Sequence, residues 1–461
     1  MRNGMSSPRI NDVEVTSDIL TGRGGLALFS RYLENIGIFE LLIDTFSYIR
    51  KTSKGLPVWM LFKQVFCFLF DGTSRHLTYF DDLKKDDGYA ATIETDPKNM
   101  ASSHTIKRFF SVFGWLCGRP FRSILRQLFI WRLKLERPDE IEFTIDTMVM
   151  DNDEAKKREA VNPTYKNVKG FQPLQIIWKG KIVDGIFRGG NKNGNHGETV
   201  IRMVKELVNL IRRKYREDVT IIIRCDAGFF DQKNYKAFDE LGIGFIASGK
   251  MYESVKEFVQ NTHQSFWNEY SNGHQVWGFT EFGFRCDNWE AFYRAIYTCP
   301  LYEGQQMLLD FARPENVILS NIGINDDVLQ HCSLERKEYW LDPKVIIESH
   351  HQRGADELPH RGFKDFGFEE LPFKRFGPNT AFYYCMLIAF FLSETFKEDV
   401  LMDVIPITSY ATTVRRKVID IAGKIINTGR RIILKVSHAT MDLLKFDQLW
   451  ENCQKPPPIL S

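Results

Sequence analysis

Hydrophobic residues recur at intervals of three and four in the first part of the chain, a spacing that predicts helices. Leu26, Phe29 and Leu33 follow it, and so do the apolar residues of 58–66. Residues 1–20 lack the pattern and are expected to form a loose arm. The spacing predicts a helical region from Gly24 to about Trp131.

The pattern changes beyond residue 136, where short runs rich in β-branched residues predict strands. The order is three strands, a helix, a strand, a helix and a strand, at 141–150, 174–178, 182–187, 198–215, 219–224, 232–241 and 243–248. This order predicts an α/β fold with a ribonuclease H-like mixed sheet flanked by helices. In that fold the first and fourth strands lie side by side.

Each of these two strands presents one carboxylate. Asp146 lies within the first strand, and Asp226 directly follows the fourth. Burying an unpaired carboxylate is costly, so Asp146 taken alone is equally consistent with a surface position on an edge strand. Because the pattern occurs twice, on strands expected to be neighbours, the sequence predicts a shared metal site.

A polar segment near residue 350 supplies a third acid. On an ideal helix with about 100° per residue, Glu357 lies about 40° from Arg353, Lys364 about 20° and His350 about 60°. One acid and three cations or hydrogen-bond donors would share one narrow face, which suits a face directed at metal and phosphate. Pro359 interrupts regular helical hydrogen bonding, so a kink is expected before Lys364.

Aromatic residues are frequent over residues 250–340, where alternating polar and apolar positions predict a mostly β insertion. Trp267, Trp277 and Trp289 lie within it. Their rings are expected to pack in the sheet. The alternative is that one of them stacks on an extruded nucleic-acid base.

Composition narrows the class of protein without selecting a function. At 461 residues the chain exceeds the size at which one core stops growing, so several domains are expected. A net charge of +2 argues neither for nor against nucleic acid, and eight scattered cysteines fit reduced thiols. The polar N-terminus lacks the apolar core that a signal peptide has, and the apolar run 382–392 is expected to be too short to span a membrane. A soluble intracellular protein without membrane contact is expected.

Clusters of basic residues predict where the chain contacts nucleic acid. The helix expected over 121–135 carries four basic residues, and 411–438 carries seven against one acid. The apolar residues of 411–438 are spaced for an amphipathic helix that would contact DNA or a second subunit. A solvated helix face is the alternative in both places. The basic residues expected at DNA in the second segment are Arg415, Arg416, Lys417, Arg430 and Arg431.

Four motifs follow one another along the chain. They are Gly-Phe-Gln-Pro-Leu (170–174), Arg-Gly-Gly-Asn (188–191), Arg-Cys-Asp-Ala-Gly-Phe (224–229) and the series His350, Arg353, Glu357 and Lys364. Together they resemble the DDE transposases of bacterial insertion sequences, in the insertion sequence 1380 group. The last motif resembles the family signature Tyr-x2-Arg-x3-Glu-x6-Lys. Three features depart from the family: Ala227 stands where it has Ser, His350 replaces the signature Tyr, and Pro359 lies between Glu357 and Lys364.

The resemblance implies a centre for phosphoryl transfer. Asp146, Asp226 and Glu357 would hold two Mg²⁺ ions, or Mn²⁺ in their place, because hard cations prefer oxygen ligands. One ion would activate water or the DNA 3′-hydroxyl, and the other would stabilise the leaving oxygen. By the same resemblance, Arg353 and Lys364 would bind phosphates near the transposon end, and His350 would donate a hydrogen bond to phosphate.

The function implied is cut-and-paste transposition by a homodimer acting on terminal inverted repeats and target DNA, in the bacterial cytoplasm at the nucleoid. Two alternatives remain: a nuclease without strand transfer, and an inactive copy that binds DNA as a repressor or architectural protein. The expected regions are a helical N-terminal DNA-binding region (1–135), the first part of the core (136–249), the β-rich insertion (250–340), the second part of the core with the third acid (341–400) and a basic helical C-terminal region (401–461).

Overall fold

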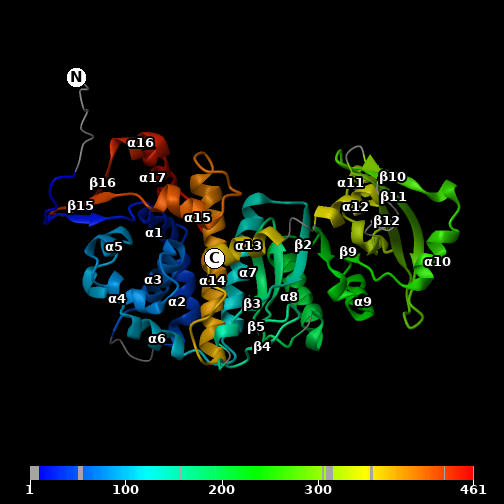
Figure 1. Ribbon diagram of the computed structural model, residues 1–461, viewed down its shortest axis with the longest axis horizontal. Helices are drawn as coiled ribbons and strands as arrows, with labels where there is room; N and C mark the ends of the chain where they lie inside the picture. Colours follow the sequence, from blue (N-terminus) through cyan, green and yellow to red (C-terminus); the bar gives the residue numbers. More distant parts are fainter. Residues whose placement is uncertain are drawn as a thin grey trace, which may run out of the picture.

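The computed structural model describes residues 10–459 apart from 50–54, 156, 193, 304–305, 308–314, 353–356 and 430. Figure 1 shows a helical part at one end, which contains the first and last segments of the chain, a sheet in the middle, and a β-rich part at the other end. Most of the buried apolar side chains form one continuous core that extends from the helical part into the sheet.

The helical part is organised around α14 (Phe376–Phe396), which is buried along almost its whole length. α14 contacts α1, α3, α6 and α7. Helices occupy the region where the hydrophobic spacing predicts them. They are α1 (Leu26–Asn35), α2 (Ile38–Phe46), α3 (Val58–Asp71), α4 (Phe80–Leu83), α5 (Asp87–Thr92), α6 (Ser103–Ser111) and α7 (Gly118–Glu136).

The apolar run within α14 is longer than the sequence analysis expects. With the turn that follows it, α14 is long and apolar enough to cross a membrane by length and composition alone. Every residue of its most apolar window is nevertheless buried inside the protein. The estimate that this run is too short was wrong, and its position at the centre of the core accounts for its hydrophobicity.

A ten-stranded mixed sheet lies at the centre, in the order β10-β11-β12-β14-β9-β8-β2-β6-β7, with β13 paired to β12. β2, β8 and β9 are parallel, whereas β6 and β7 run antiparallel to their neighbours. The prediction that the first and fourth strands pair is confirmed. The strands are β2 (Glu140–Thr147), β6 (Leu174–Trp178), β7 (Lys181–Ile186), β8 (Thr220–Cys225), β9 (Gly244–Ser248), β10 (Asn268–Ser271), β11 (Gln275–Phe284), β12 (Tyr293–Glu303), β13 (Gln306–Met307) and β14 (Asn316–Ser320).

The two faces of the sheet are covered by different helices. Ile221 and Ile223 of β8 belong to the larger core, which also contains the apolar face of α8 (Thr199–Lys214) and part of α9 (Gln232–Glu240). Ile222 faces the other way, into a smaller core with α11 (Leu334–Leu341) and α12 (Pro343–Gln352). Successive strand residues point to opposite faces, so this continuous apolar run marks a strand covered on both sides.

The β-rich insertion extends the main sheet rather than forming a sheet of its own, because β14 pairs with both β12 and β9. It also contains α10 (Glu253–Asn261). Trp277 on β11 is buried, which confirms the expected packing for this ring. Trp289 is buried in the turn between β11 and β12, and Trp267 is half-buried.

The C-terminal region differs from the prediction. In place of a helix throughout 411–438, α15 (Ala411–Val414) and one further helical turn are followed by a hairpin of β15 (Gly423–Thr428) and β16 (Arg431–Val436). Paired isoleucines on either side of Gly429, which has a φ of +61°, favour strands joined by a tight turn over a helix. The hairpin pairs with β1 (Ile19–Thr21), so the N-terminal arm is shorter than expected.

The remaining elements are a small sheet and three helices. Three short strands, β3 (Met150–Asp151), β4 (Asn162–Pro163) and β5 (Lys169–Phe171), form a small sheet in the loop after β2. Three helices complete the chain: α13 (Glu357–Phe366), α16 (His438–Leu444) and α17 (Phe446–Gln454).

Candidate functional site

Asp146 and Asp226 lie next to each other at one edge of the central sheet. β2 and β8 are parallel neighbours, and Ile145 is in register with Cys225. The next residue on each strand is an aspartate, on backbones about 4.8 Å apart. β2 ends at Thr147, so Asp146 lies at the end of its strand rather than in the middle as the sequence analysis expects. Both residues are part-exposed.

Local hydrogen bonds orient the two carboxylates. The Thr147 N–H donates to Asp146 Oδ1 (2.6 Å), and the Gly228 N–H donates to Asp226 Oδ1 (2.9 Å). A Cβ at position 228 would lie 2.9 Å from the same Asp226 oxygen, so a larger residue there would displace this carboxylate. The Asp-x-Gly spacing of the third motif therefore fixes the direction of the Asp226 carboxylate.

His360 on α13 adjoins the pair, and the sequence analysis missed it. Its Nδ1 lies 3.6 Å from Asp146 Oδ2, and its side chain is 12% exposed. Burial, with the nearby positive charges of Lys364 and Lys166, lowers the pKa of His360 to about 4. The imidazole is therefore neutral at physiological pH, and its contact with Asp146 is not an ion pair. On an ideal helix residue 360 lies about 20° from residue 353, so His360 falls on the face predicted for Arg353, Glu357 and Lys364.

Glu357 is the first residue of α13, and its side chain lies outside the described residues, as does all of Arg353. Position 357 precedes His360 by three residues, a spacing that places both on one face of a helix. Pro359 falls in the first turn of α13, where the missing N–H has no helical partner to lose, so the kink expected there is not needed. Among the side chains that the structure describes, no group of three or more potential metal ligands occurs.

Two residues predicted to contact phosphate have partners inside the protein. His350 is buried, and its Nε2 lies 2.9 Å from Ser248 Oγ on β9. Such a position holds α12 against the sheet and gives the imidazole no access to DNA in this conformation. Lys364 is about one-third exposed and pairs with Glu369 (2.7 Å).

The five basic residues of 411–438 that were predicted to contact DNA fall into two groups. Arg415 donates to the backbone oxygens of Leu69, Phe70, Asp365 and Phe366, at 2.6–3.1 Å, so its guanidinium joins α3 to the end of α13. These bonds give Arg415 a structural role, and its DNA contact remains a prediction. The others are exposed or lie outside the described residues, and their DNA contacts remain predictions: Arg416, Lys417 and Arg431 are exposed, and Arg430 is not described.

The arginines of the second and third motifs are also structural. Arg188 is buried and donates to the Gln172 and Gly194 oxygens, which links the first motif to the loop before α8. Burial lowers its pKa to about 10, so it stays protonated at neutral pH. Arg224 donates to the Ser349 carbonyl (3.2 Å) and to Thr144 Oγ1 (3.2 Å), which ties β8 to α12 and β2. The two arginines therefore support the sheet edge that carries Asp146 and Asp226, which we call the acidic edge.

A cavity of about 790 Å³ lies beside the loop that follows Asp226. Its walls are the start of α9, the loop after β9 and the turn between β11 and β12. Aromatic and basic residues line it, with Lys250 Nζ 5.4 Å from the centre of the Phe230 ring. The lining includes Phe230, Lys250, Tyr252, Arg285 and Trp289.

Comparison with known proteins gives one family match. Residues 7–457 match the family model described as transposase DDE domain group 1. No curated protein matches the chain. Among solved structures, the chain is similar to a piggyBac transposase in a cryo-EM synaptic complex with hairpin DNA, at 13% identity and a TM-score of 0.40, over 86% of this chain and 80% of that one.

Proposed function

Because the chain belongs to the transposase DDE domain group 1 family, we propose that it cleaves the ends of a transposable element and joins them to target DNA. The observation that carries the proposal is the pairing of Asp146 and Asp226 at the ends of adjacent parallel strands. The four sequence motifs favour the insertion sequence 1380 group within this family. By the family's chemistry the substrates are double-stranded terminal repeats, synapsed by two copies of the chain.

We assign β7, β6, β2, β8 and β9 to a ribonuclease H-like core. Three antiparallel strands followed by two parallel ones, with helices between them, support this assignment. The helical N-terminal region and the β-rich insertion would then be additions at opposite ends of that core.

The donor set at the acidic edge suits a hard divalent cation such as Mg²⁺ or Mn²⁺. Asp146 and Asp226 supply carboxylate oxygens from neighbouring backbones, and each is oriented by a backbone N–H. We infer that Glu357 supplies the third carboxylate, since its position on α13 is one turn before His360, which contacts Asp146. When bound, two such ions would activate the attacking oxygen and stabilise the leaving one during displacement at phosphorus.

The chain's own residues supply orientation around that centre. His360 limits the directions that the Asp146 carboxylate can take, and Gly228 does the same for Asp226. Lys364 lies one turn beyond His360 on α13 and pairs with Glu369. When DNA binds, Lys364 would leave Glu369 and bind a substrate phosphate, since both are charge-assisted contacts to an anion. The aromatic and basic cavity beside Asp226 offers flat surfaces for bases near the cleaved bond.

Replacing Glu357 with Gln is expected to lower end cleavage by about 10²–10³-fold, because the amide keeps the shape but loses the negative charge that a divalent cation needs. Glu348→Gln is the matched control, since Glu348 lies exposed on α12 and is expected to leave the rate unchanged. The measurement is the single-turnover rate of nicking on a labelled end duplex. A Glu357→Gln protein as active as the control would remove Glu357 from the site.

Replacing His360 with Ala is expected to raise the metal concentration needed for half-maximal cleavage by about 10–100-fold, the usual effect of removing a partner of a metal-held carboxylate. His360→Asn is expected to restore much of this loss, because its amide nitrogen occupies about the place of Nδ1. His196→Ala is the control, since His196 is exposed and its loss is expected to leave the metal dependence unchanged. If His360→Ala and His360→Asn needed the same metal concentration for half-maximal cleavage, the nitrogen near Asp146 would have no part in metal binding. His360 would then contribute only packing.

Strand transfer separates the proposal from its alternatives. A pre-cleaved end with a free 3′-hydroxyl is incubated with the protein, Mg²⁺ and a supercoiled plasmid, and joined products are counted. We expect covalent end–plasmid products. Cleavage without joining would indicate a nuclease, and binding without either reaction would indicate an inactive DNA-binding copy.

A further inference from the structure

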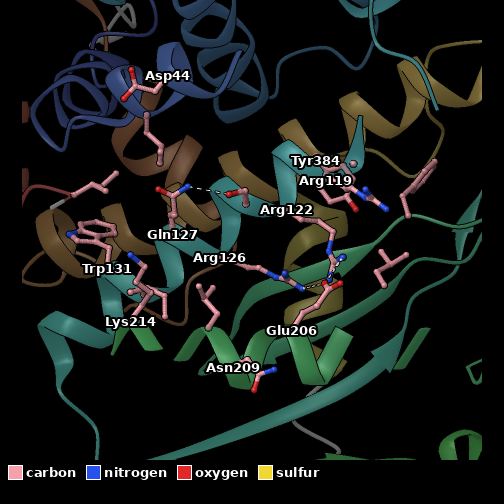
Figure 2. Close-up of a pocket in the computed structure, with 18 of the residues that line it drawn as sticks. Asp44, Arg119, Arg122, Arg126, Gln127, Trp131, Glu206, Asn209, Lys214 and Tyr384 are labelled. Atoms are coloured by element: carbon pink, nitrogen blue, oxygen red, sulfur yellow. Dashed lines mark hydrogen bonds and ion pairs between the residues drawn. The ribbon is translucent and has the colours of Figure 1, made fainter. Parts of the chain in front are cut away.

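A long groove separates α7 from α8 on the helical side of the sheet. It has a volume of about 1130 Å³, and its walls are α7, α8 and the end of α2 near Asp44. Figure 2 shows Arg122 and Arg126 of α7 reaching toward Glu206 of α8. Arg119 and Gln127 of α7 and Asn209 of α8 also line the groove. We call this the α7–α8 groove.

The floor of the groove is a neutralised charge cluster. Asp184 on β7 is fully buried and accepts hydrogen bonds from Arg122 and Arg126 at 2.7–2.9 Å. Glu206 adds a second acid, 2.8 Å from Arg126 and 3.2 Å from Arg122. Arg122 and Arg126 are two of the four basic residues of 121–135 that predicted a nucleic-acid contact. Both are used within the protein and help hold α7 and α8 to the sheet.

The rims of the groove carry cations that the fold does not use. Arg119, Lys134, Arg202, Arg213 and Lys214 are exposed and line the groove. None of the five has a hydrogen bond or ion pair to another residue that the structure describes. Among the described residues of the lining, the acids without a cationic partner are Glu40 and Asp44, both on α2. Ser123, Gln127 and Asn209 add uncharged donors.

The spacing of these cations suits a polymer rather than a small molecule. Arg202 and Arg213 are separated by about 16 Å along α8, and Arg119 and Lys134 by about 22 Å along α7, at 1.5 Å per residue. One DNA strand advances about 3.4 Å per nucleotide along the duplex axis, so the rims match about five to seven phosphates. A small-molecule site would instead bring its polar groups to one point.

The groove leads away from the acidic edge. The loop before α8 is tied to the loop after Asp226, because Asn195 Nδ2 donates to the Gly228 carbonyl (3.2 Å). α7 connects to β2 through a short turn, so the start of α7 lies toward the end of β2 that bears Asp146. Arg202 and Arg119 are therefore at the near end, and Lys214 and Lys134 at the far end.

We propose that the α7–α8 groove binds the sugar–phosphate backbone of duplex DNA, as a track that continues from the cleavage site. The inference rests on the proposed function, and it assigns a surface for the DNA that lies beyond the reacting phosphate. Recognition here is electrostatic, because the rims offer cations and amides at phosphate spacing and no element that would enter a base-pair groove.

The test measures duplex binding at several salt concentrations in EDTA, so that cleavage does not intervene. Arg202→Gln is compared with Lys205→Gln, since Lys205 is exposed on α8 but outside the groove. Each lost phosphate contact lowers the slope of log K against log salt by about 0.9. We expect a fall of about one for Arg202→Gln, none for Lys205→Gln, and about three for Arg202→Gln, Arg213→Gln and Lys214→Gln combined.

Each outcome has a separate meaning. A slope for the triple variant equal to that of the wild type would overturn the groove proposal and leave the proposed function standing, and an acidic protein partner would then suit these cations better. A wild-type chain that bound no duplex would overturn both. Thermal unfolding of the variants serves as the folding control, because the three side chains make no hydrogen bond or ion pair with another described residue.

Discussion

Replacing Asp146 with Asn is expected to reduce cleavage at the transposon end by about 10³-fold while duplex binding in EDTA stays unchanged. The asparagine oxygen can still accept the Thr147 N–H bond, so the strand end keeps its shape. The lost charge removes one of the oxygen ligands proposed for the metal, at a cost of about 4 kcal/mol in transition-state stabilisation. The measurement is a single-turnover nicking rate beside a binding isotherm for the same duplex.

Asp151→Asn is the control for this variant. Asp151 is exposed, lies five residues further along the chain, and interacts with the Asp153 backbone and the Glu369 side chain. Its substitution is expected to leave the cleavage rate within about twofold. Equal rates for Asp146→Asn and Asp151→Asn would show that the carboxylate of Asp146 takes no part in the reaction.

Replacing Asp184 with Ala is expected to lower the free energy of unfolding by about 3–5 kcal/mol, because two part-buried guanidinium groups would lose their common partner. Asp184 is fully buried. Burial alone would lower the pKa of Arg122, but the negative charge of Asp184 raises it above its usual value. Urea unfolding followed by tryptophan fluorescence measures the change.

The control here is Glu206→Gln. Glu206 pairs with the same two arginines, but its side chain is 40% exposed. We expect it to cost less than about 1 kcal/mol, since solvent screens exposed ion pairs. If Asp184→Ala were as mild as Glu206→Gln, the buried cluster would contribute little to the attachment of α7.

The sequence was sufficient to predict the acidic edge. Period-2 and buried apolar runs marked β2 and β8, and the order of elements placed them side by side, because parallel neighbours need a crossover between them. Asp226 was located at the end of β8, since the strand begins with a run of isoleucines and Asp226 directly follows its last residue, Cys225. Asp146 lies nearer the strand end than its apolar surroundings suggested, because β2 ends at Thr147.

Other features depended on partners far apart in the chain. Arg122 and Arg126 had the pattern of a basic helix face, and only the fold shows that Asp184, about 60 residues later, neutralises them. His360 had no motif to mark it, and its importance comes from contact with β2. The β15–β16 hairpin was predicted as a helix because charge and spacing were weighed above the β-branched pairs. The DNA contacts of Arg353 and Arg430 remain predictions outside the described residues.

The central claim is that the sheet edge formed by Asp146 and Asp226 cleaves DNA with a bound divalent metal ion. The most direct measurement incubates a labelled duplex containing the element's own end with the protein in Mg²⁺, in Mn²⁺ and in EDTA, for the wild type and for Asp226→Asn. We expect a nick at the end of the element in either metal, none in EDTA, and none from Asp226→Asn in any buffer. Nicking in EDTA, or nicking by Asp226→Asn at the wild-type rate, would contradict the claim.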